Sequence, residues 1–259
     1  MSARTLEAGA GLAAALGVRL DGLFVEDADL VHLGGLPFAR EISAVTGAWS
    51  GLDTDEVVRS LRLEGARLER LLAQAAERAR VPWSFATSRG RLLAQAVERE
   101  AELTILGAAS RVAGAARTLP AEARTRTLRG SLAVFFDASP GSLRALEVAG
   151  ELAAALGSKL HVLVPEAGTS QEDAAARERA RSWLTTEGRV GYVLRIRTGE
   201  MALADALRAS QSELLIHAVP DLAQSMRGLA TLVAKLPCPL LIVRQAGARA
   251  RAVQRDVQS

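Results

Sequence analysis

Residues 5–26, TLEAGAGLAAALGVRLDGLFVE, return at residues 145–166 as ALEVAGELAAALGSKLHVLVPE, without a gap and with 11 identities in 22 positions. In each copy an apolar, alanine-rich stretch ends at a glycine and leads into a short apolar run. This is the pattern of an amphipathic helix followed by a strand. The chain is therefore a tandem duplication with an offset of 140 residues between its copies.

The second copy is the complete one. Its pattern predicts strands at 131–136, 159–164, 189–197, 213–217 and 239–244, separated by helices at 142–156, 171–185, 200–209 and 222–235. Strands that alternate with helices imply an α/β fold with a parallel sheet, right-handed crossovers and helices on both faces. The strand residues expected to be buried are Leu132, Val134, Leu163, Leu215, Ile216, Leu241 and Val243.

The first copy shows the same middle but lacks both outer strands. It predicts helices at 2–16, 55–80 and 91–100 and strands at 19–25, 81–88 and 102–106. The place of the opening strand, which is SLAVFFDASPG at Ser131–Gly141 in the second copy, falls before Met1, and residues 107–130 contain no apolar strand. Either the strands at 19–25 and 102–106 pair directly, or the natural chain starts earlier and Met1 is an internal methionine. We favour the earlier start, because Ser2 and Arg4 already match Ser142 and Arg144.

An insertion at 27–53 is found only in the first copy. Its centre, LGGLPFAREISAVTGAWSG, is rich in glycine and apolar residues. A loop of that length is uncommon inside a compact domain unless it packs against something or serves a function. We expect it to cover part of the first domain, and a contact between subunits is the alternative.

Length and composition support two domains in 259 residues, 49% of them apolar. We expect an incomplete domain at 1–129, a complete domain at 130–245 and a disordered basic tail at 246–259. The single cysteine, Cys238, excludes an internal disulfide framework and favours the reducing cytoplasm. No apolar run is long enough to cross a bilayer, and no aromatic residues accompany the arginines of the tail, so neither a membrane nor nucleic acid is an expected partner.

The second copy resembles the universal stress protein family. The resemblance is carried by the pattern DxSxxSxxAL at 137–146, by SLRALEVAGELAAALG on the first helix and by LPCPLLIVR at the last strand. It covers both copies and is fullest over Ser131–Arg244. It implies two tandem open sheets of Rossmann-like strand order 3-2-1-4-5, with a site at the carboxyl ends of the strands where the strand order changes direction.

Members of the family that bind nucleotides carry a G-x2-G-x9-G-[ST] pattern after the fourth strand. Glycines let backbone N–H groups approach phosphate oxygens closely, and the last Ser or Thr adds a hydroxyl donor. In the second copy Ala218 and Asp221 stand at the first two glycine positions, and the Asp221 carboxylate would repel a phosphate. In the first copy only Gly107 is kept, and Ser110 takes the second position. The motif is degenerate in both copies.

The turn with Asp137, Ser139 and Ser142 is the best candidate for ligand contact. The resemblance implies that Asp137 contacts the adenine end of a nucleotide, while the alternative is that Asp137 and Ser142 only organise a turn and cap a helix. His217 ends the fourth strand and is expected near Asp137. Such a pair can transfer protons, but no nucleophile is evident, so we expect no enzymatic activity.

Two functions follow from these observations. The first is a cytoplasmic regulatory or interaction module in the stress response, without a cofactor and without the usual ATP binding. The alternative is a stress protein that binds ATP or AMP through Asp137, Ser139, Ser142, Ala218 and Gly107. The expected partners are the protein itself, as an intramolecular pseudo-dimer or a homodimer, and an unknown protein.

Overall fold

The computed structural model describes residues 3–36, 38, 40–42, 47, 49–51, 53–98, 101–106, 130–166, 168–220 and 222–244. These residues divide into two compact units. The first contains the described residues up to Glu98, and the second contains residues 101–106 together with those from 130 onward. Each unit is an α/β structure.

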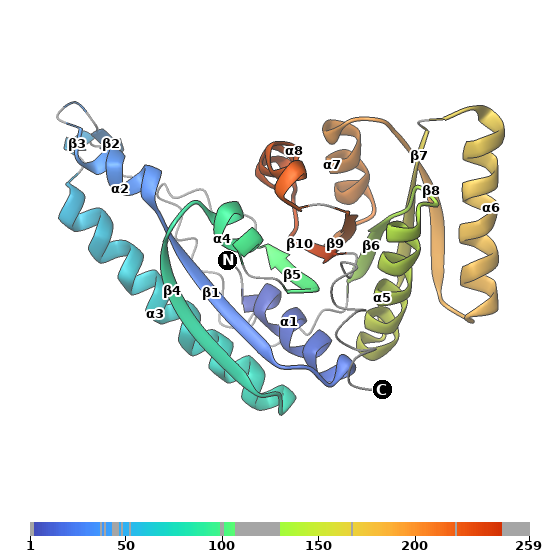
Figure 1. Ribbon diagram of the computed structural model, residues 1–259, viewed down its shortest axis with the longest axis horizontal. Helices are drawn as coiled ribbons and strands as arrows, with labels where there is room; N and C mark the ends of the chain where they lie inside the picture. The colour runs from blue at the N-terminus through green and yellow to red at the C-terminus, as the bar shows by residue number, and fades with distance from the viewer. Residues whose placement is uncertain are drawn as a thin grey trace, which may run out of the picture. The chain divides into compact units, whose positions relative to one another are not determined.

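The second unit alternates strands and helices along the chain (Figure 1). Its elements are β6 (Ser131–Phe135), α5 (Pro140–Leu156), β7 (Leu160–Glu166), α6 (Ser170–Thr186), β8 (Gly191–Arg197), α7 (Glu200–Ala209), β9 (Ser212–Val219), α8 (Leu222–Lys235) and β10 (Leu240–Arg244). The helix ends follow the sequence signals. Ser139 caps the start of α5, and Gly157, with a φ of 61°, ends it in the left-handed conformation.

The strand order in this unit is β10-β9-β6-β7-β8, with all neighbours parallel. In order of appearance this is 5-4-1-2-3, which confirms the expected topology. The central strand β6 pairs with β7 on one side and with β9 on the other. All seven strand residues expected in the core are buried, with exposed fractions of 3% or less.

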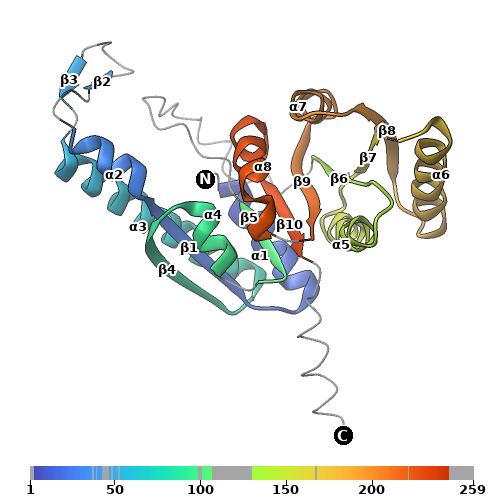
Figure 2. The same ribbon diagram turned by 45° about the horizontal axis from the view of Figure 1, so that its top comes forward.

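Helices cover both faces of this sheet. α5 and α6 lie on one face, and α7 lies on the other with α8 beside it (Figures 1 and 2). α5 packs closely on α6, because a Cβ placed on Gly150 would lie 2.5 Å from Cη2 of Trp183. Cys238 is buried next to β10, and burial raises the pKa of its thiol to about 12, so that it remains an unreactive thiol at neutral pH.

The first unit contains a two-stranded parallel sheet. β1 (Leu20–Asp27) pairs with β4 (Trp83–Gly90), in register from Leu20 opposite Trp83 to Asp27 opposite Gly90. Its main helices are α1 (Ala3–Leu16), α3 (Thr54–Ala79) and α4 (Leu92–Glu98). α1 packs on α3, and a small core of buried alanines joins them: Ala10, Ala13, Ala75 and Ala76, with Val81 beside them.

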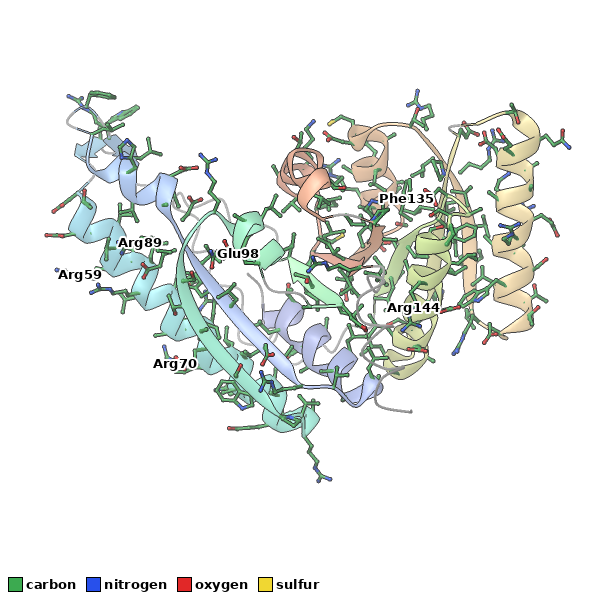
Figure 3. All side chains as sticks on the ribbon, in the orientation of Figure 1. Arg59, Arg70, Arg89, Glu98, Phe135 and Arg144 are labelled. Atoms are coloured by element: carbon green, nitrogen blue, oxygen red, sulfur yellow. The ribbon has the colours of Figure 1, made fainter. Side chains whose placement is uncertain are left out.

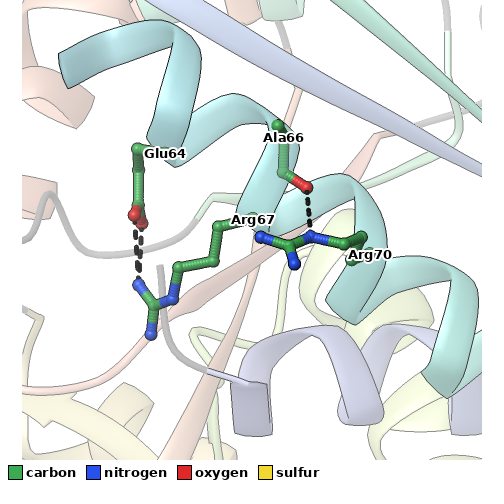
Figure 4. A network of polar contacts seen from close by, with 4 residues as sticks. All are labelled: Glu64, Ala66, Arg67 and Arg70. Carbon is green, nitrogen blue, oxygen red and sulfur yellow. Dashed lines mark hydrogen bonds and ion pairs between the residues drawn. The ribbon is translucent and has the colours of Figure 1, made fainter.

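α3 is the amphipathic helix that the sequence predicts. Leu68, Leu72 and Ala75 are buried along one side. On the other side the arginines bind within the helix itself: Arg67 donates to Glu64, and Arg70 donates to the carbonyl oxygen of Ala66 (Figure 4). This charged side is an ordinary solvated face.

The insertion folds into a short helix, α2 (Ala28–Gly34), and a small antiparallel hairpin of β2 (Arg40–Ile42) and β3 (Trp49–Gly51). α2 packs on α3. The two aromatic residues of the insertion are exposed, Phe38 at 75% and Trp49 at 65%. The insertion therefore covers part of the first unit through α2, as expected from the sequence, whereas its two described aromatic side chains are exposed.

The strand β5 (Leu103–Leu106) belongs to the sheet of the second unit, where it pairs antiparallel with β10. The first of our two solutions for the missing opening strand is therefore wrong. The strand at 102–106 does not pair with the strand at 19–25: β1 pairs with β4, and β5 pairs with β10. Leu241 of β10 lies opposite Ile105, so the apolar strand β5 pairs with another apolar strand, β10.

Across the helices that the structure describes, none is both long and apolar enough to span a membrane.

Candidate functional site

The candidate site lies at the carboxyl ends of β6 and β9, where the strand order changes direction. The chain leaves β6 through the buried Phe136 and enters a tight turn at Asp137. One Asp137 carboxylate oxygen accepts a hydrogen bond from the backbone N–H of Ser139, at 3.0 Å. Between them Ala138 has a φ of 64°, in the left-handed region that a residue with a Cβ rarely adopts. The turn is thus held in a strained conformation of the kind that is common at binding sites.

Ser139 and Ser142 organise the helix that follows. The Ser139 hydroxyl accepts a hydrogen bond from the Ser142 N–H at 3.2 Å, and the Ser142 hydroxyl donates to the Ser139 carbonyl at 3.0 Å. Ser142 is 2% exposed. The N-cap is therefore Ser139 and not Ser142 as expected, because α5 begins at Pro140, and Ser142 lies in its first turn and supplies the N–H that Ser139 caps.

Asp137 is the charged group of the turn. Partial burial alone would raise the pKa of Asp137, but the hydrogen bonds from Ser139 and Ser142 outweigh it and lower the pKa below its ordinary value. The carboxylate is therefore ionised at neutral pH. The Asp137 side chain remains exposed, so that it can accept further hydrogen bonds from a ligand.

His217 lies on β9 next to β6, within the electrostatic field of Asp137. The nearness of these two residues was expected from the sequence. The imidazole ring stands edge-on to the ring of Phe135, with centroids 4.9 Å apart. Phe135 is labelled in Figure 3. Burial lowers the pKa of His217, and the negative charge of Asp137 opposes this only in part. The residue is a neutral imidazole at pH 7, and its buried Nδ1 has no hydrogen-bond partner within the described residues.

The position of the first phosphate-loop glycine is part of the sheet. Ala218 lies opposite Val243 and Val219 lies opposite Arg244 in the parallel ladder between β9 and β10. Ala218 is buried, at 9% exposed. Val219 is followed by Pro220, which has no backbone N–H. The carboxyl end of β9 therefore presents few backbone donors for a phosphate.

The structure brings together four of the five candidate residues. Asp137, Ser139 and Ser142 form one turn, and Ala218 lies one residue before the end of β9, the strand that pairs with β6. Gly107 lies outside the described residues, as do Asp221 and Ser110. Sequence reasoning missed Phe135, Ala138 and Pro220. Only Pro220 left a signal in the sequence, since a proline inside a donor loop removes a donor.

Within the part of the chain that the structure describes, no group of three or more His, Cys, Asp or Glu side chains is arranged to hold a metal ion. A surface hollow of about 370 Å³ lies away from the Asp137 turn, at the end of β8 and the start of α7. Arg197, Gly199 and Lys235 line it, and Lys235 forms an ion pair with Glu200 at 2.6 Å.

Comparisons with known proteins agree with the topology. No family model matches the sequence, and no curated protein matches it. The crystal structure of a universal stress protein from Archaeoglobus fulgidus DSM 4304 is similar over 94% of this chain and 92% of its own, with a TM-score of 0.54 and 13% identity. A putative universal stress protein from Pseudomonas aeruginosa UCBPP-PA14 matches over 92% of this chain and 97% of its own, with a TM-score of 0.45 and 11% identity. A universal stress protein in complex with cAMP matches over 44% of this chain and 96% of its own, with a TM-score of 0.38 and 21% identity. The order of the strands in the second unit and the similarity to the Archaeoglobus protein along nearly the whole chain lead to one conclusion: this chain has the fold of the universal stress proteins.

Proposed function

We propose that this protein is a member of the universal stress protein family that acts as a regulatory or interaction module and does not bind ATP in the usual way. The observation that carries the proposal is the carboxyl end of β9. There Ala218 and Val219 are paired with β10, and Pro220 follows directly.

Phosphate binding by a loop depends on backbone N–H groups that point at the ligand, helped by glycines that let the phosphate come close. A Cβ on Ala218 and a missing N–H at Pro220 both oppose this arrangement. Asp221 adds a negative charge to the same stretch of sequence. Two like charges a few ångströms apart in a partly buried site repel each other by on the order of a few kcal/mol.

A second candidate function is binding of an adenine nucleotide, ATP or AMP, through Asp137. It is favoured by one observation, the exposed and ionised Asp137 carboxylate in its strained turn. A ligand with amino or hydroxyl donors could use this acceptor without the phosphate loop. In that case affinity would come from the base and sugar, and AMP would bind about as well as ATP.

The proposal includes a cytoplasmic location, a role in the stress response and the absence of catalysis. Acid–base chemistry at Asp137 and His217 would need a third group in position to be activated. The described contacts of the two residues are instead structural: Asp137 accepts from Ser139, and His217 contacts Phe135. We expect no hydrolysis of ATP above the rate without protein.

Isothermal titration of the full chain with ATP and with AMP tests the proposal. We expect no saturable heat at micromolar ligand for the unchanged chain. Asp137→Ala removes the only feature that favours the alternative. Asp205→Ala is the matched control, because Asp205 is an exposed aspartate outside the Asp137 turn that forms an ion pair with Arg208 on its own helix.

The outcomes separate the two functions. Micromolar binding that is lost in Asp137→Ala and kept in Asp205→Ala would establish the second function and refute the first. A gain-of-binding variant gives an independent check. If the β9 end is the cause, the combined change Ala218→Gly, Pro220→Gly and Asp221→Gly should raise ATP affinity at least about tenfold, since several backbone contacts would become available.

A further inference from the structure

We propose that His217 makes the Asp137 turn sensitive to acid: once protonated, the imidazole draws the Asp137 carboxylate away from Ser139, and the turn opens. The proposal concerns the shape of the turn and the regulation of whatever uses it. It does not depend on whether the turn binds a nucleotide.

The first step is the placement of His217 and Asp137 on one face of the sheet. In the parallel ladder between β6 and β9, Val134 lies opposite Ile216, so Phe135 comes opposite His217, and the rings of these two residues are in contact. Asp137 follows two residues after Phe135. Because side chains alternate along an extended chain, Asp137 lies one diagonal step from His217, a spacing of about 7–8 Å that a histidine side chain can reach across.

At neutral pH the two side chains are engaged separately. One carboxylate oxygen of Asp137 accepts a hydrogen bond from the Ser139 N–H at 3.0 Å. The Nδ1 atom of His217 is buried and has no hydrogen-bond partner among the residues that the structure describes. Burial lowers the pKa of His217, so that its imidazole is neutral at pH 7. The negative charge of Asp137 thus lies close to His217 while its carboxylate holds the turn.

Protonation of His217 changes the balance between these contacts. An imidazolium has an N–H donor on both ring nitrogens, so Nδ1 then requires an acceptor. A buried positive charge without an opposite charge is strongly unfavourable, and a hydrogen bond between two charged groups is stronger than one from a neutral backbone N–H. The Asp137 side chain is short, and its carboxylate cannot turn toward His217 and keep its bond to Ser139. The bond to Ser139 is therefore lost.

The other elements around His217 do not compete for the proton. On β10, Ile242 lies opposite His217, and Arg244 is the next residue on the same face. The buried residues of α7 are Leu203, Ala204 and Leu207. The carboxylates of α7 form ion pairs of their own, Glu200 with Lys235 and Asp205 with Arg208. Within the described part of the chain, Asp137 is the charge that raises the pKa of His217 against the effect of burial.

The turn itself is ready to change. Ala138 has a φ of 64°, a left-handed conformation that costs energy for a residue with a Cβ. The hydrogen bond from Ser139 to Asp137 spans this residue and closes the turn around it. When that bond is lost, Ala138 is free to return to a negative φ. Strain stored at Ala138 therefore favours opening once His217 is protonated.

His161 shows that a buried histidine on this sheet face is not sufficient. It lies opposite Ala133 of β6, and Ala133 lies opposite Leu215 of β9, so His161 shares the face of His217. Burial lowers the pKa of His161, and the positive charge of Lys159 lowers it further. A protonated His161 thus meets a cation where His217 meets a carboxylate. We expect His161 to titrate without moving the turn.

Nuclear magnetic resonance of the full chain labelled with ¹⁵N tests the proposal between pH 8 and pH 4.5. The Ser139 amide reports on the turn, because its N–H is the donor to Asp137. Its signal should move with the same midpoint as the imidazole nitrogens of His217. Hydrogen exchange of this amide, corrected for the intrinsic effect of pH, should become at least about tenfold faster on protonation, as loss of a hydrogen bond predicts.

Three variants separate the two histidines and the carboxylate. Asp137→Asn keeps an oxygen that accepts from the Ser139 N–H but removes the negative charge. In this variant the turn should stay closed in acid, and the pKa of His217 should fall further. His217→Gln should also keep the turn closed. His161→Gln is the matched control, in which the turn should open as in the unchanged chain.

The proposal is wrong if the Ser139 amide still responds to acid in His217→Gln, or if the pKa of His217 does not fall in Asp137→Asn. Unfolding of the whole chain before His217 takes up a proton would also overturn it, since the folded chain would then have no protonated form. If His217→Gln does not fold, Asp137→Asn decides the question, because Asp137 is exposed and its replacement leaves the core intact.

Discussion

The two copies of the repeat begin alike and end in different environments. β1 and β7 follow matching helices and match each other, yet β7 lies between β6 and β8, whereas β1 pairs with β4. In β7, Val162, Leu163 and Val164 are at most 1% exposed. The three positions that match them in β1, residues 22–24, are only half-buried. The identical leucines Leu23 and Leu163 therefore differ in burial, in line with the two neighbours of β7 and the one described neighbour of β1.

Replacing the matching leucines of the two strands gives the largest expected effect on this comparison. Leu163→Ala should lower the free energy of unfolding by about 2–5 kcal/mol, since it opens a cavity in a closed core. Leu23→Ala should cost about 1 kcal/mol, because a half-buried side chain loses less contact. Urea unfolding with hydrogen exchange by mass spectrometry assigns each loss to its own unit. Leu63→Ala, at a residue 66% exposed, is the control and should change little. Equal losses at Leu163 and Leu23 would show that the two strands are equally enclosed.

The next largest effect on stability is expected in α1 and α5, the helices that precede these two strands. The position of Gly150 in α5 is occupied by Ala10 in α1, which is buried. Gly150→Ala should destabilise the second unit by about 1–2 kcal/mol, because its Cβ would meet the Trp183 ring and the gain in helix propensity offsets only part of the strain.

Thermal unfolding of a double-mutant cycle with Trp183→Leu measures the cause of this loss. The smaller side chain should remove most of the cost of Gly150→Ala. Additive effects of the two changes would contradict the contact between α5 and α6.

A smaller difference concerns a carboxylate that both copies keep at the end of the second strand. Glu26 accepts two hydrogen bonds from Arg89, at 3.0 and 3.2 Å, and its side chain is 10% exposed. Glu166 forms an ion pair with Arg195 and is 31% exposed. Glu26→Gln should cost about 1 kcal/mol and Glu166→Gln about half of that, since solvent screens the more exposed pair. Urea midpoints at low and high salt measure both, and a larger loss at Glu166 would reverse the comparison.

The smallest expected effect is on the pH dependence of the free energy of unfolding. β9 carries His217, whereas its match in β5 is Leu106. Burial lowers the pKa of His217 in the folded chain below the ordinary 6.5. As the pH falls through 6.5 the unfolded chain takes up a proton that the folded chain does not, so stability decreases on the acid side. His217→Leu should flatten this slope in urea unfolding between pH 8 and 5, while His161 keeps its own contribution in both proteins. If the free energy of unfolding changed equally with pH in the unchanged chain and in His217→Leu, His217 would not be buried as a neutral group.

Much of the fold could be predicted from local pattern. The helices at 200–209 and 222–235 have the predicted bounds, and the strands of the second unit differ by at most two residues at each end. Amphipathic periods and glycine or serine caps are local signals, and they are strong in this chain. The proximity of Asp137 and His217 also followed, because neighbouring parallel strands end at the same edge of a sheet.

The site itself was predicted less completely. Ser139 and Ser142 were correctly placed in one turn with Asp137, but the left-handed conformation of Ala138 was not foreseen. Alanine carries no signal for a positive φ, which arises because the turn must close between Asp137 and Ser139. The contact between Phe135 and His217 was also missed, since side chains on adjacent strands meet only when the register is known.

The sequence by itself determined the duplication, the order of helices and strands, and the parallel sheet of the second unit. These depend on residue periodicity and on short connections between neighbours. Only the tertiary structure decided that β5 leaves the other strands of the first copy and pairs antiparallel with β10. An apolar strand has hydrogen-bonding groups on both edges, and its own residues do not specify which partner they meet. That choice is made where edges come together in space, between residues more than a hundred positions apart.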